Sequence, residues 1–134
     1  MEADRDFWQA LKEQQLDFFN TEEPLWRLSL ASDIETDTLH ELAIDDHINE
    51  DAILYEWGGA LRWLKTDIVN ETIQKTLEKS GGHASLFRDK KSNPGRTSSI
   101  FQPLSPGLSH IHKKIKLAFD PKNILNPGKQ YPDL

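Results

Sequence analysis

Cysteine is absent from this 134-residue sequence, and so are long apolar runs. Without cysteine there are no disulfides, no thiolate metal ligands and no cysteine nucleophile, which is typical of a cytoplasmic protein. The apolar stretches are only a few residues long, too short for a membrane-spanning helix. The opening segment, MEADRDFWQALKEQ, is acidic and has no apolar centre, so we expect no secretory signal.

Several motifs that carry chemistry are also missing. The glycine pairs Gly58-Gly59 and Gly81-Gly82 have neither the G-x-G-x-x-G spacing of dinucleotide-binding loops nor the lysine of a Walker loop. The sequence contains no G-x-S-x-G nucleophile elbow. The residues alone therefore assemble no complete active site, and we assign no catalytic residue.

Charge is distributed unevenly along the chain. Residues 1–56 hold 16 acidic and 3 basic side chains, whereas residues 57–134 hold 6 acidic and 13 basic ones. Either the two halves attract each other once folded, or the basic half faces an anion such as a carboxylate or a phosphate-bearing cofactor. The basic residues are scattered and the acidic half repels phosphates, so we expect no nucleic-acid partner.

The middle of the chain reads as a sheet with helical crossovers. Alternating apolar residues predict strands at 25–30, 52–57, 60–65 and 83–88. Helices are predicted at 35–43 and 68–79, the second capped by Asp67 and ended by Gly81-Gly82. The other glycine pair is predicted as a two-residue hairpin turn. This β-α-β-β-α-β order predicts an α+β, ferredoxin-like antiparallel sheet with helices on one face.

A further helix is predicted at each end. One runs from Asp4, its cap, to about Phe19, and the other opens at Ser105-Pro106 and ends near Ala118. The last helix is expected to turn four apolar residues inward: Leu108, Ile111, Ile115 and Leu117. We therefore expect a single domain over 1–134, consisting of a leading helix (1–20), a sheet core (24–88), a polar loop (89–99) and a closing helix with its tail (105–134).

The first strand has two different faces. Its alternation places Leu25, Arg27 and Ser29 on one side, and Trp26, Leu28 and Leu30 on the other. Three tryptophans are expected to pack in the core or across strands rather than to form a stacking platform: Trp26, Trp57 and Trp63.

Five histidines raise the question of a metal site or a general base. His110 and His112 are two apart on a predicted helix and point in different directions, so we expect no metal centre. His40 and His47 lie in the acidic stretch, where solvation is expected. His83 starts a strand directly after a glycine pair, where it either makes a routine edge hydrogen bond or faces a ligand.

Arg62 lies in a predicted strand, and an arginine on a core-facing side of a strand needs an anionic partner or an exit to water. Two alternatives are open. Glu50, Asp51 or Glu56 supplies the partner, or a substrate or cofactor oxyanion does.

The tail FDPKNILNPGK (119–129) ends a helix, because Pro121 and Pro127 cannot continue it and Gly128 permits the turn. The same segment resembles the C-terminal signature of FAD-linked oxidases of the vanillyl-alcohol oxidase type. Four segments extend the likeness to the glycolate oxidase subunits of that family: PLWRLSL (24–30), EWGGALRWLK (56–65), GGHASLFR (81–88) and NPGKQYPDL (126–134).

This resemblance implies FAD-dependent oxidation of a 2-hydroxy acid, glycolate, with the chain acting as a cap domain. It implies an N-terminal flavin domain that precedes this part of the subunit, and a flavoprotein and an iron–sulfur sister subunit. FAD is then a cofactor of the full-length subunit and is not expected on this portion alone. Location is implied to be cytoplasmic, or peripheral to the inner membrane through the complex.

The resemblance also marks positions that face cofactor or substrate: Gly58, Gly59, Arg62, His83, Arg88, Asn126 and Gly128. Asn126 and Gly128 belong to the tail that approaches the flavin domain in this family. The alternative reading is a non-catalytic ferredoxin-like module that binds a small anion or a partner protein.

Overall fold

A computed structural model describes residues 2–34, 50–89 and 100–133. Four strands form the centre: β1 (Leu25–Ser29), β2 (Ile53–Glu56), β3 (Leu61–Lys65) and β4 (His83–Arg88). Three α-helices are described: α1 (Glu2–Lys12), α3 (Asn70–Lys79) and α4 (Pro106–Phe119). The predicted helix at 35–43, His40, His47 and most of the predicted 89–99 loop lie outside the described residues.

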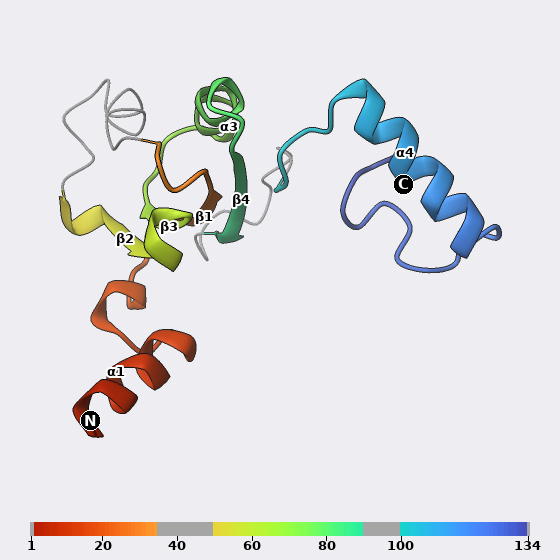
Figure 1. The fold of residues 1–134 in the computed structure, drawn as a ribbon. Coiled ribbons are helices and arrows are strands. Elements are labelled where there is room, and N and C mark those ends of the chain that lie inside the picture. The colour runs from red at the N-terminus through yellow and green to blue at the C-terminus, as the bar shows by residue number, and fades with distance from the viewer. Residues whose placement is uncertain (1, 35–49, 90–99, 134) are drawn as a thin grey trace.

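The strands form one antiparallel sheet in the order β2-β3-β1-β4 (Figure 1). The helix α3 connects β3 to β4 and packs on the sheet, in which β3 and β1 are the two interior strands. This arrangement confirms the predicted α+β class, with an antiparallel sheet of the ferredoxin-like kind. The outer edge of β4 is extended by a short segment, since Leu86 N donates to Ile100 O and Gln102 N to Ala84 O.

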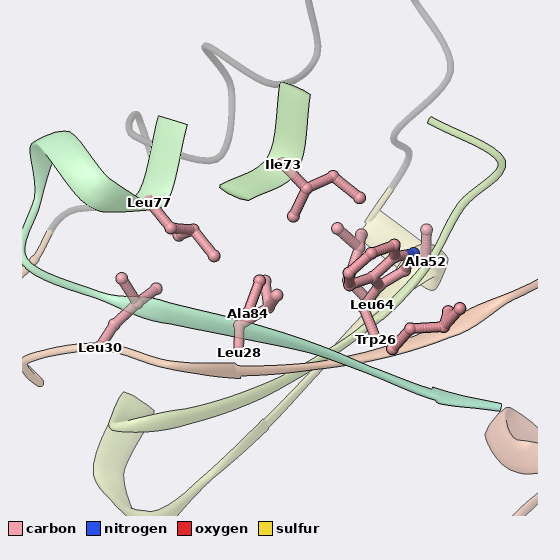
Figure 2. Close-up of a cluster of buried hydrophobic side chains, with 9 residues drawn as sticks. Trp26, Leu28, Leu30, Ala52, Leu64, Ile73, Leu77 and Ala84 are labelled. Atoms are coloured by element: carbon pink, nitrogen blue, oxygen red, sulfur yellow. The ribbon is translucent and has the colours of Figure 1, made fainter. Parts of the chain in front are cut away.

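One face of the sheet carries the main apolar core. Trp26 and Leu28 of β1 are fully buried there and lie under Ile73 and Leu77 of α3 (Figure 2). The rest of this cluster comes from neighbouring strands and connections: Leu30, Ala52, Leu64, Ala84 and Leu86. The alternation predicted for the first strand is confirmed, because its even-numbered residues supply this core.

The opposite face is only partly covered. A second cluster packs Phe19 on Leu25 and Trp63, with the Phe19 and Trp63 ring centroids 5.5 Å apart in an edge-on contact. The chain between α1 and β1 supplies this cover. Three polar side chains of the same face stay exposed: Arg27, Ser29 and His83. We call these three residues and the half-buried Ser85 the open sheet face.

The leading helix is shorter than predicted. It ends at Lys12, and Gln14 takes a positive φ of 55°. Gln14 N donates to Leu11 O and Gln15 N to Ala10 O, the bond pair of a Schellman motif. The motif usually has glycine at the position that Gln14 occupies, so the sequence carries no glycine that would mark the end of this helix. The chain then returns to the sheet through a 3₁₀ turn, Asp17–Phe19.

Two further predictions are corrected. The β2–β3 connection has four residues rather than two, because Glu56 pairs with Leu61, and its Trp57 is 76% exposed instead of packed. Asp67 does not cap the next helix, which begins at Asn70 with Val69 in the cap position and no side-chain capping bond. The far end is as predicted, since Gly81 has a φ of 70° and completes a Schellman motif.

The helix α4 begins as predicted, with the Ser105 hydroxyl accepting a hydrogen bond from Leu108 N. The prediction for its apolar residues is wrong. Leu108, Ile111, Ile115 and Leu117 are 45–65% exposed, because α4 and its tail lie to one side of the sheet, beyond β4 (Figure 1). Periodicity identified an apolar stripe, but no described element covers it. No described helix has the length and apolar character needed to cross a membrane.

Candidate functional site

Both glycine pairs lie at the same end of the sheet. Leu30 N, just after β1, donates to Ala60 O beside Gly58-Gly59. Gly82 packs against the same end of β1, where an added Cβ would come within 2.3 Å of Leu30 Cδ2. Gly58 and Gly59 have φ values of 60° and 89°, a conformation that glycine adopts without strain. The sheet register thus brings together two motifs that are far apart in sequence.

Arg62 fixes this end of the sheet from the helix-covered side. It pairs directly with Leu28, so it shares the face of the main core, and it is only 2% exposed. Its Nε donates to Gly59 O at 3.0 Å and its Nη2 to Ile34 O at 2.5 Å. The guanidinium also lies 5.4 Å from the centre of the Tyr55 ring. Arg62 therefore ties the Gly58-Gly59 turn to the chain that leaves β1.

Two backbone carbonyls, rather than a carboxylate, are the described partners of Arg62. Glu56, one of the predicted partners, instead accepts a hydrogen bond from Trp63 Nε1 at 2.8 Å. Within the described part of the chain, Arg62 Nη1 is buried without a hydrogen-bond partner. A substrate-facing role for Arg62 stays a prediction, while its structural contacts are evident.

His83 lies on the open sheet face, directly opposite Ser29. Its exposure leaves the imidazole accessible at the edge of the glycine-rich end. Arg88, at the other end of β4, is already engaged, since its Nη1 donates to Phe19 O at 2.8 Å and its Nη2 to Gln14 Oε1 at 3.2 Å. Of the predicted positions, His83 is exposed on the sheet, and Arg88 holds the covering segment.

Arg27 was not among the predicted site residues, yet it occupies the centre of the open sheet face. The register aligns one row across the sheet: Leu54, Trp63, Arg27, Ser85 and Phe101. A hollow of about 530 Å³ lies over this row and is lined by Arg27, Ser85, Trp63, Phe87 and Phe101 among others. The signal was present in the alternation of β1, which sets Arg27 opposite to the core residues.

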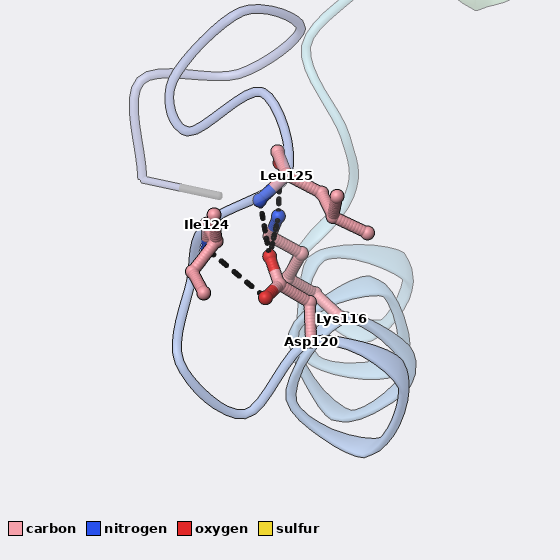
Figure 3. Close-up of polar contacts among 4 residues, drawn as sticks. All are labelled: Lys116, Asp120, Ile124 and Leu125. Atoms are coloured by element: carbon pink, nitrogen blue, oxygen red, sulfur yellow. Dashed lines mark hydrogen bonds and ion pairs between the residues drawn. The ribbon is translucent and has the colours of Figure 1, made fainter.

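The tail is held by the carboxylate of Asp120, at the end of α4 (Figure 3). This carboxylate accepts hydrogen bonds from Ile124 N at 2.9 Å and Leu125 N at 2.8 Å, and from Lys116 Nζ at 2.6 Å. The Lys116 ammonium also donates to Leu125 O. The Lys116 bond and then the two amide bonds lower the pKa of Asp120 from 3.8 to about 2.

Asn126 and Gly128 follow in the tail with φ values of 46° and 68°. Asn126 borders an apolar hollow of about 700 Å³ between α4 and the tail, lined also by Ile115, Phe119 and Leu125. Neither residue lines the hollow over Arg27. The tail then returns along α4, where Lys113 Nζ lies 2.5 Å from the Asp133 carboxylate. The predicted positions therefore form separate groups rather than one site.

The described residues offer no ready metal or dinucleotide site. No three side chains among His, Asp and Glu gather there as metal ligands. His110 is exposed, whereas the half-buried His112 ring centroid lies 6.2 Å from that of Tyr131. Both glycine pairs lead into strands instead of a helix N-terminus, so neither forms the pyrophosphate cradle of a dinucleotide-binding loop.

Sequence comparison shows which proteins this chain is similar to. Residues 97–130 match the family described as FAD linked oxidases, C-terminal domain. The particular relative is glycolate oxidase subunit GlcE of Escherichia coli (strain K12), to which the chain is 39% identical over 129 residues. That match covers 96% of this chain and 32% of the relative, in its C-terminal part. No solved structure matches the chain. The resemblance predicted from the sequence is confirmed.

Proposed function

We propose that this chain is the cap portion of an FAD-dependent 2-hydroxy-acid oxidase subunit, with glycolate as the substrate. The observation that carries the proposal is the 39% identity to a glycolate oxidase subunit, which extends over nearly the whole chain. The alternative of a non-catalytic binding module has no comparable support. The open sheet face suits the proposed role, because it exposes Arg27 and His83, and Arg27 lines an uncovered hollow.

FAD would be held by a preceding flavin domain of the full-length subunit, since the described residues provide no pyrophosphate cradle. Bound there, FAD would accept the hydride equivalent that a hydroxy acid loses on oxidation to the keto acid. The chain described here would contribute the surface over the substrate. His83 would face the substrate, and the turn at Gly58-Gly59, fixed by Arg62, would shape one end of that surface.

The tail would close the assembly. Lys116 and Asp120 fold it back at the end of α4, leaving Asn126 beside an apolar hollow and Gly128 two residues further along the tail. The exposed apolar stripe of α4, together with Ile124 and Leu125, would be buried against the flavin domain. This burial is favourable because it removes apolar surface from water. Activity would require this domain together with flavoprotein and iron–sulfur sister subunits. Attachment to the inner membrane would occur through that complex.

The proposal is tested by comparing the isolated chain with the assembled enzyme. The isolated 134-residue chain should purify colourless and should not oxidise glycolate. The full-length subunit, co-expressed with its sister subunits, should be yellow and should convert glycolate to glyoxylate with an artificial electron acceptor. Assembled enzyme that carries flavin but oxidises no short 2-hydroxy acid would refute the proposed substrate class. One FAD bound per isolated chain would refute the proposal that the preceding flavin domain holds the cofactor.

A further inference from the structure

The geometry points to Arg27 as the residue that binds the carboxylate of the hydroxy acid, in the hollow over the central row of the open sheet face. The substrate class rests on the function proposed above, whereas the site itself rests on the structure. Arg27 lies in the PLWRLSL segment (24–30), but the family resemblance did not mark it as a site residue. Arg27 would be a substrate-binding residue, and Ser85, opposite it on β4, would supply a second hydrogen-bond donor.

The position of Arg27 is fixed by the sheet. It lies in the interior strand β1, paired with Trp63 on one side and Ser85 on the other. A ladder on both sides holds the backbone, so the guanidinium starts from a rigid base rather than from a loop. Trp63 is itself locked, since its Nε1 donates to Glu56 and its ring packs edge-on to Phe87 at 5.0 Å.

The composition of the hollow favours an anion. Among the described residues that line it, Arg27 is the one cation and none carries a carboxylate. The other lining side chains are mostly apolar, including Leu61, Leu86 and Phe101. Although Arg27 is exposed, its guanidinium can pair with a carboxylate through charge-assisted hydrogen bonds beside these apolar walls. The planar guanidinium also matches a carboxylate with two parallel hydrogen bonds.

The other arginines of the sheet are less available. Arg62 lies on the opposite, helix-covered face and donates to Gly59 and Ile34. Arg88 donates to Phe19 and Gln14. Arg27 has no ion pair with any residue that the structure describes. The size of the hollow, about 530 Å³, accommodates a small organic acid.

Oxalate is a suitable probe, because it carries carboxylates and is not a 2-hydroxy acid. Titration of the ¹⁵N-labelled 134-residue chain should give saturable amide shifts at Arg27, Trp63 and Ser85. Arg27→Gln should weaken binding by about ten-fold or more, because it removes a charge-assisted pair of hydrogen bonds. Arg27→Lys should retain part of the affinity. Lys75→Ala, which changes an exposed cation on α3, should leave binding unchanged.

Wild-type chain without saturable shifts at these residues, or Arg27→Gln with wild-type affinity, overturns the site. Unchanged amide spectra elsewhere in the sheet show that each variant is folded. If Arg27→Gln does not fold, Arg27→Lys is used in its place, and wild-type affinity of that variant also overturns the site. Failure of the proposed function is distinguishable from failure of the site. Binding at Arg27 without glycolate oxidation by the assembled enzyme would retain the site and reject the function. Glycolate oxidation without binding at Arg27 would retain the function and reject the site.

Discussion

Lys116 and Asp120 form an ion pair of 2.6 Å one turn apart at the end of α4, and the Asp120 carboxylate also accepts the amides of Ile124 and Leu125. One side chain thus ends the helix and sets the direction of the tail. An arrangement of this kind stabilises a local fold that has few apolar contacts of its own. The tail is therefore expected to depend on a single carboxylate.

Replacement of that carboxylate should loosen the tail. Asp120→Asn removes the charge and one of the acceptor oxygens, so the amides of Ile124 and Leu125 should exchange with solvent about ten-fold faster. Hydrogen exchange followed by NMR measures this directly. Amides of β1 should keep their protection, since the sheet does not depend on the tail. Unchanged exchange at Ile124 and Leu125 would show that the carboxylate does not hold the tail.

Acid should have the same effect within a defined pH range. The pKa of Asp120 is about 2 in the folded chain against 3.8 for a free carboxyl. Because the folded pKa is lowered, the stabilisation is complete above about pH 4 and is lost as the pH falls through about 2. A carboxyl-detected NMR titration should give this pKa, and Lys116→Met should raise it. A titration of Asp120 near 3.8 in the wild type would contradict the described contacts.

Arg62 is predicted to stabilise the folded chain. Arg62→Ala would remove a buried side chain and leave the partly buried carbonyls of Gly59 and Ile34 without their donor, lowering the free energy of unfolding by about 2–4 kcal/mol. Chemical denaturation measures the loss, with Lys75→Ala as an exposed control. Oxidation by the assembled enzyme should fall as well, because the Gly58-Gly59 turn loses its tie. If Arg62→Ala has the same free energy of unfolding as Lys75→Ala, Arg62 does not stabilise the fold.

Gly82 should tolerate no side chain. A Cβ at this position would lie 2.3 Å from Leu30 Cδ2 and 3.0 Å from Ser29 O, so Gly82→Ala should cost about 1–3 kcal/mol of unfolding free energy. Gly107→Ala is the matched control, since no atom lies within 4 Å of its added Cβ and alanine favours the helix. Equal melting temperatures for the two variants would mean that β1 does not approach Gly82 closely.

Local rules predicted much of the sheet but not the surfaces around it. The strand at 83–88 and the Ser105 cap follow from alternation and from capping chemistry, which depend on near neighbours. The partners of Arg62 did not follow, because Ile34 O is 28 residues away and a backbone carbonyl leaves no mark in composition. The same holds for the exposed stripe of α4. An apolar period shows that a face needs cover and does not say which element provides it.

The role of Arg27 at the site was missed for a related reason. Alternation placed it on the polar side of β1, but only the register reveals that Trp63 and Ser85 flank it across the sheet. Motif likeness instead drew attention to Arg62, which the register places on the covered face. Side-chain direction in the sheet thus distinguishes the two strand arginines, with Arg27 on the open face and Arg62 on the covered one.

The most direct test of the account is anaerobic reduction of the flavin by glycolate in the assembled enzyme, followed in a stopped-flow spectrometer. Wild type and Lys75→Ala should both bleach the flavin band rapidly and saturate at the same glycolate concentration. Arg27→Gln should need about ten-fold more glycolate for half-saturation, because its carboxylate contact is lost. Flavin that glycolate does not reduce, or Arg27→Gln that behaves as Lys75→Ala does, would contradict the account.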